Sequence, residues 1–316
     1  MISSKRSPFF VVAALGVLTA IPIASAQQQA QFRNIDVSQK ASVMQTIGVT
    51  DVTITYHRPA VKGRTIFAEA PATMESRAKG DTTLDNQHER KPGEPIVPYD
   101  HVWRAGANDA TVFQVTDDVL INGQPLKAGT YGLEAIPGKD DWTIIFNSDS
   151  GQWGAFSYDP KKDVLRVKAK PHTSTENQEW LLYTFDPVTP NTATVNLRWE
   201  KVSVPFTVEV KDVKAVWRAK TDALIAANPT NEVFPLQAAN TFAADKNWDD
   251  ALKYVDQSIK VKPTFRNLSA KANILRNAGK TQDAVTAADQ AISQGKTEGV
   301  DTGAFEKRVA GWKSGT

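Results

Sequence analysis

The alternation of apolar and polar residues constrains the fold of this chain more than any other feature, because its period changes near Lys211. Within residues 41–210 the period is two, as in Val52, Ile54 and Tyr56 with polar residues between them, and this is typical of strands. We expect strands at residues 52–57, 110–115, 119–121, 130–136, 142–146, 153–158, 164–169, 180–185, 193–199 and 202–210. Short strands with no helical pattern between them predict a mainly β domain, an antiparallel sandwich or a jelly-roll-like fold.

Turn signals and one long polar segment separate these strands. Asn122 and Gly123 both tolerate a positive φ, so they predict a type I′ hairpin turn. Residues 68–95 are polar and show no period. A connection of this length within a compact domain is usually functional or disordered, so we expect a long, mobile surface loop there.

From residue 211 onward the apolar residues follow a period of 3.6, which predicts an all-α domain over residues 211–316. Its first helix is expected to bury one face, formed by Val213, Val216, Trp217, Ala223, Leu224 and Ala227. Ala239 and Ala251 recur 33 positions later as Ala272 and Ala284. This spacing is similar to tetratricopeptide repeats, in which small residues lie where paired helices cross. A generic pair of helical hairpins is the alternative, and we expect residues 305–312 to form a capping helix.

The N-terminus carries the pattern of a cleavable signal peptide over residues 1–26. Two basic residues precede an apolar run at residues 9–20, and Ala24-Ser25-Ala26 supplies the small-residue cleavage pattern. An ordinary apolar helix would explain neither the basic start nor the small-residue end. We therefore expect a periplasmic or secreted protein whose mature chain begins at Gln27, with a flexible segment over residues 27–40. The apolar run is too short for a permanent anchor, so no integral membrane segment is expected after cleavage.

Composition excludes several classes of chemistry. The chain has no cysteine, which excludes disulfides, thiolate metal sites and thiol nucleophiles. It has 37 basic and 35 acidic residues, and Lys5 and Arg6 of the predicted leader account for the excess. The mature chain is therefore neutral, which argues against nucleic acid and anionic membrane surfaces as partners.

Two stretches concentrate polar and aromatic residues. Residues 56–64 read Tyr-His-Arg-Pro-Ala-Val-Lys-Gly-Arg, and residues 97–110 read Val-Pro-Tyr-Asp-His-Val-Trp-Arg-Ala-Gly-Ala-Asn-Asp-Ala. Together with Asn122-Gly123, Ala128-Gly129-Thr130-Tyr131, Phe146-Asn147 and Trp153-Gly154-Ala155, they resemble the bacterial exported family known as domain of unknown function 2911. The resemblance covers about residues 38–210. The family has no assigned activity, so the resemblance indicates a surface and no reaction.

The resemblance carries over, position by position, to Tyr56, Arg58, Pro59, Lys62, Gly63, Arg64, Tyr99, Trp103, Arg104, Gly106, Ala107, Asn108, Asn147 and Trp153. This chain departs from the family pattern in three places. Asp109 occupies the position of a glutamate, and His57 and His101 stand where the family has no histidine. The loop at residues 68–95 is longer than in many relatives.

The two stretches supply the residue types of a ligand site if they adjoin in the folded domain. The candidate binding residues are Tyr56, Arg58, Lys62, Arg64, Tyr99, Trp103, Arg104, Asn108 and Asp109. Arginine side chains bind carboxylates and phosphates through forked donors, and Gly106 permits a close backbone approach. We expect a small anionic or sugar-like ligand. The structural alternative is that the arginines pair with acids such as Asp109 inside the sandwich and that Trp103 belongs to the core.

Three functions are compatible with these residues. We favour a non-enzymatic binding module whose helical region at residues 211–316 contacts a protein partner, because helical repeats form concave binding surfaces. The second is a hydrolase-type enzyme that uses His57, His101, Asp109 and Arg104, which must then converge within hydrogen-bond reach. The third is a structural envelope protein without a ligand.

Metal and cofactor chemistry has no clear signature. The histidines show no metal-ligand spacing, and neither a nucleophile motif nor a phosphate loop occurs. Paired carboxylates of a glycosidase meet only in three dimensions, and Asp109 and Glu134 are the candidates for such a pair. We therefore expect no metal and no cofactor.

Overall fold

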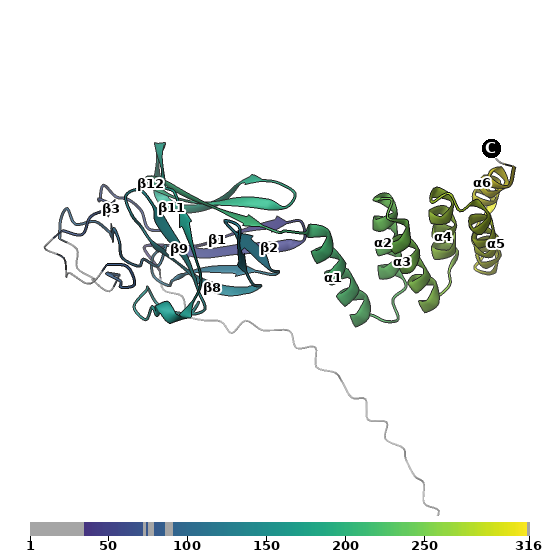
Figure 1. Cartoon of the computed structure of the whole chain (residues 1–316), viewed down its shortest axis with the longest axis horizontal. Helices are drawn as coiled ribbons and strands as arrows, with labels where there is room; N and C mark the ends of the chain where they lie inside the picture. The colour runs from purple at the N-terminus through teal and green to yellow at the C-terminus, as the bar shows by residue number, and fades with distance from the viewer. Residues whose placement is uncertain (1–34, 72–73, 75–78, 86–90, 315–316) are drawn as a thin grey trace, which may run out of the picture. The chain divides into compact units, whose positions relative to one another are not determined.

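The computed structural model of the chain describes residues 35–71, 74, 79–85 and 91–314. The predicted signal peptide and most of the predicted flexible N-terminal segment lie outside these residues. The described part contains antiparallel sheets followed by six helices (Figure 1). The predicted fold class, a β domain followed by a helical domain, is therefore confirmed.

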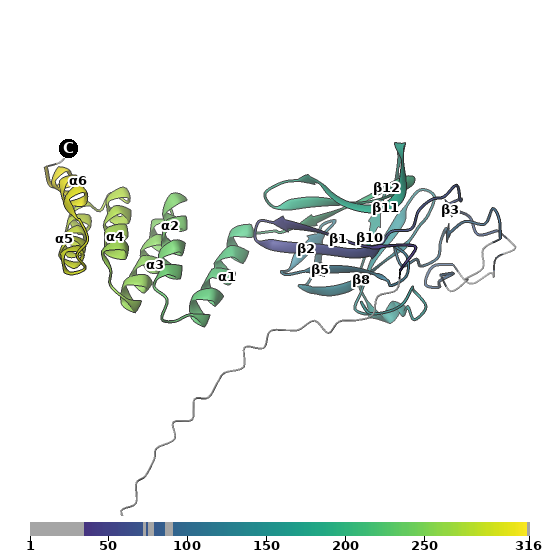
Figure 2. The same ribbon diagram turned by 180° about the vertical axis from the view of Figure 1, so that it is seen from behind.

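Two main sheets form the β domain (Figures 1 and 2). The larger sheet is antiparallel, in the order β1 (Lys40–Ile47), β2 (Thr50–His57), β5 (Thr111–Val115), β8 (Gly129–Ile136), β9 (Trp142–Asn147) and β10 (Asp163–Ala169). The smaller sheet has the order β11 (His172–Val188), β12 (Thr192–Glu209), β6 (Val119–Ile121) and β7 (Gln124–Leu126). A short parallel pair joins β3 (Phe67–Ala68) to β4 (Val97–Pro98), and a single 3-10 turn covers Pro160–Lys162.

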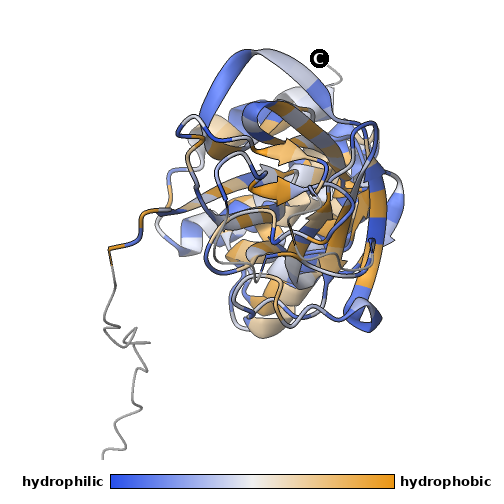
Figure 3. Cartoon of the chain, turned by 90° about the vertical axis from the view of Figure 1, so that its left-hand side faces the viewer, coloured by the Kyte–Doolittle hydropathy of each residue, from blue (hydrophilic) through white to orange (hydrophobic). Residues whose placement is uncertain are grey.

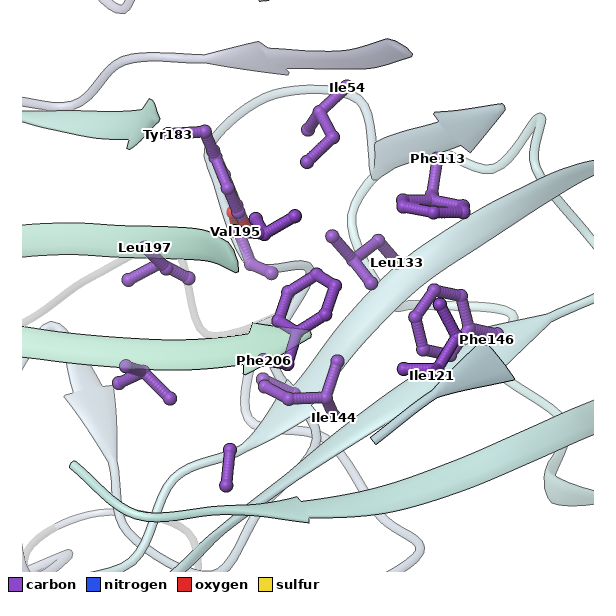
Figure 4. Packing of buried hydrophobic residues seen from close by; sticks show 14 of the residues in the cluster. Ile54, Phe113, Ile121, Leu133, Ile144, Phe146, Tyr183, Val195, Leu197 and Phe206 are labelled. Atoms are coloured by element: carbon purple, nitrogen blue, oxygen red, sulfur yellow. The ribbon is translucent and has the colours of Figure 1, made fainter. Parts of the chain in front are cut away.

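The core of the β domain follows the predicted period of two. From Thr50 to Tyr56, alternate residues of β2 are buried and the residues between them are partly or fully exposed, whereas the last residue, His57, is buried as well. Aromatic rings from both sheets interlock in the core (Figure 4): the Phe113 and Phe146 ring centres are 5.0 Å apart, and Phe206 of β12 lies 6.0 Å from Phe146. Hydrophobic residues are concentrated on the strands (Figure 3), so burial of their apolar side chains stabilises the sandwich.

The strand predictions miss the short strands β3, β4 and β7 and differ from the structure in three larger features. β1 was not among the predicted strands, and the two strands predicted over residues 193–210 form one continuous strand, β12. The pairing of β11 with β12 shifts register near Glu200, whose φ is 53°. This local irregularity interrupts the alternation of apolar and polar residues, so the sequence pattern predicted two strands there. Residues 154–157 form turns, and Trp153 makes only an isolated bridge to Asp109. Gly154 has a φ of +67°, and a Cβ there would lie 3.0 Å from the Arg104 guanidinium, so the chain bends where a strand was predicted.

Parts of the polar segment at residues 68–95 pack against the β domain. Met74 and Leu84 are both buried. Thr83 forms a bridge to Val102, and its hydroxyl donates a hydrogen bond to the Val102 carbonyl at 2.9 Å. Thr83 and Leu84 are therefore not at the surface, where the loop was expected. Residues 72–73, 75–78 and 86–90 lie outside the described part, and the mobility of the loop stays a prediction.

The helices are α1 (Val213–Ala227), α2 (Val233–Ala244), α3 (Trp248–Val261), α4 (Phe265–Asn277), α5 (Thr281–Thr297) and α6 (Gly303–Ser314). α2 packs against α3, and α4 packs against α5. The four alanines at the repeated positions, Ala239, Ala251, Ala272 and Ala284, have no exposed surface, as close helix crossings require. The helical hairpins are established, and their assignment to the tetratricopeptide class stays a prediction.

The predicted face of α1 is correct for its first half only. Val213 and Val216 pack against the β core, and Trp217 packs against the core of the helical part. In the second half Ile225 is buried instead, and Ala223, Leu224 and Ala227 are exposed. The helix contacts the β core at its start and the helical core further along. Its buried residues therefore do not lie on one continuous face.

Candidate functional site

The two motif stretches adjoin around one cavity of about 330 Å³, the motif cavity. The lining consists of Val37, Ser38, Pro59, Ala60, Lys62, Arg64, Asp85, Ile96, Trp103, Arg104, Gly106, Ala107, Asn108, Trp180 and Trp199. Five of the nine predicted binding residues belong to it, namely Lys62, Arg64, Trp103, Arg104 and Asn108. A cavity of this size is in the range of small-molecule sites.

Two tryptophans form the buried wall of the motif cavity. The rings of Trp103 and Trp199 are stacked, with centres 6.0 Å apart and planes inclined by 16°. Trp103 Nε1 donates to the Gly106 carbonyl at 3.1 Å. Trp199 Nε1 is also buried, but it has no hydrogen-bond partner among the described residues. A buried donor without an acceptor costs free energy and demands an explanation.

Arg104 pairs with Asp85 and not with Asp109. Its Nε and its backbone N–H both donate to Asp85 Oδ2 at 3.0 Å, and Nη2 donates to the Asp85 carbonyl at 3.2 Å. The two side chains are only 13% and 10% exposed. Nη1 donates to the Asn108 carbonyl at 2.8 Å. The structural alternative is thus correct that Arg104 is held by an acid, but the acid comes from the polar loop.

The two motif stretches contain four non-glycine residues with a positive φ, Lys62, Asp100, Ala105 and Asn108, and the last two lie beside the motif cavity. Ala105 and Asn108 have φ values of 49° and 58°, in the left-handed region that costs about 1–2 kcal/mol for a residue with a Cβ. Gly106 is required because a Cβ there would lie 2.7 Å from Thr111 Oγ1. The Ala105 carbonyl accepts hydrogen bonds from Thr111 Oγ1 at 3.0 Å and from Tyr183 Oη at 2.9 Å. Such over-determined backbone strain is typical of functional sites.

The other four predicted binding residues lie outside the lining of the motif cavity. Tyr56 is a core residue whose hydroxyl accepts a hydrogen bond from the Tyr183 N–H at 3.2 Å. Arg58 Nε donates to a backbone carbonyl of β11 at 2.8 Å. Tyr99 is half-buried, and its burial raises its pKa. Asp109 is exposed and lines a different cavity.

Six lining residues lie outside the two motif stretches: Val37, Ser38, Asp85, Ile96, Trp180 and Trp199. Three of them come from segments far from the motifs in sequence. Asp85 belongs to the polar loop, Trp180 to β11 and Trp199 to β12. A tryptophan in an alternating strand has the pattern of an ordinary core residue, so the sequence carries no signal for the two aromatic walls. The length of the polar loop was the one signal that led toward Asp85.

A second cavity of about 320 Å³ lies beside the motif backbone and includes His57, Asp109 and Gln152 in its lining. The hydrolase hypothesis needs four groups to converge. His57 and Asp109 share the second cavity, whereas Arg104 lines the motif cavity. His101 lines neither, and its Nδ1 is hydrogen-bonded to the Tyr99 carbonyl at 2.8 Å. The structure therefore brings together two of the four residues.

Behind the second cavity, Glu134 of β8 is fully buried. Its Oε1 accepts a hydrogen bond from Gln152 Nε2 at 3.2 Å, and no described residue bonds to its Oε2. Burial, together with the negative charges of Asp163 and Asp149, raises the pKa of Glu134 to about 8. The carboxyl is therefore neutral at pH 7.

Among the described residues, no group of three or more histidine and carboxylate side chains is arranged to hold a metal ion. None of the helices in the described ranges is long and apolar enough to cross a bilayer.

Fold and cavity together define a class of protein: a β sandwich in which two arginine-containing motifs, one of them with a tryptophan, line a cavity, followed by helical hairpins. The model of the family described as "Protein of unknown function (DUF2911)" matches residues 38–208, more than half of the chain, and the chain belongs to this family. No curated protein and no solved structure matches it.

Arg104→Ala is expected to lower the free energy of unfolding by about 3–5 kcal/mol, because Asp85 then loses the cation that compensates its burial. Urea denaturation followed by tryptophan fluorescence measures the loss. Lys79→Ala removes an exposed ion pair with Asp100 and should cost less than about 1 kcal/mol. An Arg104→Ala loss as small as that of this control would contradict the assigned role.

Glu134 predicts a pH dependence of stability. In the unfolded chain the carboxyl ionises near its ordinary pKa of 4.5, whereas in the folded protein it keeps its proton up to about pH 8. The free energy of unfolding should therefore fall by up to about 5 kcal/mol as the pH rises through this window, and level off above it. Glu134→Gln should abolish the fall in urea titrations across the window. Glu176→Gln, at an exposed position of β11, should retain it; equal slopes for wild type and Glu134→Gln would contradict the prediction.

Proposed function

We propose that the protein is an exported binding protein whose β domain holds a small, oxygen-rich anion in the motif cavity. The observation that carries the proposal is Trp199, a residue of the cavity lining whose buried N–H has no acceptor within the described part of the chain. Buried donors are nearly always satisfied in native proteins. A ligand oxygen in the cavity would satisfy this one.

The charges of the lining favour an anion. Lys62 and Arg64 are both exposed at the motif cavity, and the acid in its lining, Asp85, is engaged by Arg104. The Arg64 guanidinium is anchored by hydrogen bonds to the Val61 and Ala60 carbonyls, which fixes its position beside the cavity. A ligand that supplies acceptors, such as a carboxylate, a phosphate or sugar hydroxyls, matches this excess of donors.

The distribution of residues supports binding over hydrolysis. The motif cavity offers aromatic faces and hydrogen-bond donors, whereas His57 and Asp109 belong to the second cavity. A periplasmic or secreted location is part of the proposal, and it rests on the signal-peptide pattern of residues 1–26, which lie outside the described residues.

The proposal is tested by thermal denaturation with inorganic phosphate, succinate and glucuronate as probes. A ligand at 100 times its Kd stabilises the folded state by about 2.7 kcal/mol. At least one of the probes should raise the Tm of the wild type, and Lys62→Ala should reduce this shift because the exposed ammonium no longer contacts the anion. Lys307→Ala, at an exposed position of α6, is the matched control. Absence of any shift, or equal shifts in both variants, would refute binding in the motif cavity.

A second candidate function concerns a protein partner of the helical part. A cavity of about 330 Å³ lies between α2 and α4, and its lining includes Asn240, Asn273, Asn277 and Arg266. Asn240 and Asn273 occupy equivalent positions of the two repeats. A side-chain amide offers the donor and acceptor that a peptide group needs, and Arg266 adds a positive charge. We therefore propose an extended, acidic peptide as the partner.

Peptides selected from a random library on the intact protein provide the test of this surface. The selected peptides should be acidic, and the double variant Asn240→Ala, Asn273→Ala should lose their binding. A double variant of the exposed Thr286 and Lys307 on α5 and α6 should keep it. Selection of peptides that bind the first double variant as tightly as the wild type would exclude this surface.

A further inference from the structure

Three aromatic side chains of the described residues are strongly exposed. Trp153 is 55% exposed, Trp180 40% and Phe156 38%. The remaining tryptophans in the described ranges are buried or half-buried. Single exposed apolar side chains are ordinary, but exposed aromatic side chains that gather beside one segment mark an interaction site.

All three exposed rings border the same short stretch of the motif, residues 104–109. Trp180 lines the motif cavity. Phe156 lies against the Arg104 guanidinium, which is 5.4 Å from the centre of its ring. Trp153 forms a backbone bridge with Asp109, and the adjacent Gly154 N–H donates to the Asn108 carbonyl at 3.0 Å. The three exposed aromatic residues are therefore all neighbours of residues 104–109, whose side chains line the motif cavity on one side and the second cavity on the other.

Residues 152–156, which carry two of these rings, bury a polar side chain and expose two aromatic ones. Gln152 and Ala155 are buried, whereas Trp153 and Phe156 are exposed. Stability would favour the large apolar side chains inside and the amide outside. Instead, the inward Gln152 bonds to Glu134, and its carbonyl accepts from the Ala110 N–H at 3.1 Å. These contacts fix the segment with its aromatic faces toward solvent.

The surroundings of the rings indicate the kind of partner. A protein interface of ordinary size buries about 800 Å² of each partner around a continuous apolar centre. Here polar groups separate the rings, among them the Asp109 carboxylate and the Asn108 amide, and cavities of about 330 and 320 Å³ lie beside them. Exposed aromatic rings beside polar groups suit sugar rings, whose apolar C–H faces stack on aromatic side chains while their hydroxyls bond to the polar groups.

The positive charges at the motif cavity indicate that the ligand is acidic. Lys62 and Arg64 are exposed at the motif cavity, and the buried N–H of Trp199, another residue of its lining, has no acceptor among the described residues. We infer that the ligand is an acidic oligosaccharide, with one acidic sugar in the motif cavity and the adjoining sugar rings stacked on Trp180, Phe156 and Trp153. This inference rests on the proposed function, since it extends the ligand of the motif cavity from a single small anion to a chain.

The test compares chain lengths by isothermal titration calorimetry on the intact protein. The probes are hexasaccharides of polygalacturonate, alginate and hyaluronan, each with its acidic monosaccharide, and neutral maltohexaose. At least one acidic hexasaccharide should bind roughly ten-fold more tightly than its monosaccharide, which corresponds to about 1.4 kcal/mol. Trp153→Ala should remove most of this gain and leave the monosaccharide affinity unchanged. Leu224→Ala, at an exposed apolar position of α1, should change neither.

The outcomes separate this inference from the proposal on which it rests. Equal affinities for every hexasaccharide and its monosaccharide would overturn the extended site and leave the motif cavity as a site for small anions. Maltohexaose binding as tightly as the acidic chains would overturn the acidic class. A protein dimer that Trp153→Ala converts to monomer, measured by light scattering, would assign the exposed rings to a protein interface. Phosphate, succinate and glucuronate that fail to shift the Tm would refute the proposed function itself.

Discussion

The contact between Arg104 and Asp85 is the interaction on which the candidate site depends. It joins three segments that are distant in sequence: the polar loop, the motif and the turn that carries Phe156. Burying two charges is costly, and here the cost is offset by the hydrogen bonds that both groups make. A planar guanidinium with fixed donor directions is needed, because one side chain must bond to Asp85 and to the Asn108 carbonyl at once. Lysine offers a single charged point and would not set both distances.

Two buried acids beside the motif are held in different ways. Asp85 faces a guanidinium at 3.0 Å, whereas Glu134 faces only the amide of Gln152 at 3.2 Å. With negative neighbours and no cation against it, Glu134 keeps its proton, as its pKa of about 8 indicates. One acid therefore orients the motif through an ion pair, and the other orients the Gln152 segment as a neutral group.

The sequence predicted the β domain, the hairpin turn at Asn122 and Gly123, and the helical hairpins, because each is encoded by a local period or a turn dipeptide. Asn122 and Gly123 do have positive φ values, 46° and 80°. The motifs also identified five of the residues around the motif cavity. The other residues of the motif cavity are brought there by tertiary contacts, which the sequence pattern does not reveal. Nothing near Trp199 in the sequence distinguishes it from a core residue, and the exposure of Trp153 follows from a turn imposed by Gly154, not from its alternation pattern.

One wall of the motif cavity comes from the first part of the chain that the structure describes. Val37 and Ser38 contribute to the lining, and the Ser38 carbonyl accepts a hydrogen bond from the Asn108 side chain at 3.2 Å. The family match begins at residue 38, so a recombinant fragment cut at the family boundary would start within the site. It would lose Val37 and place a charged terminal amine beside the Asn108 contact. Protein prepared for ligand binding therefore needs to retain the residues that precede Ser38, and an affinity tag belongs at the C-terminus.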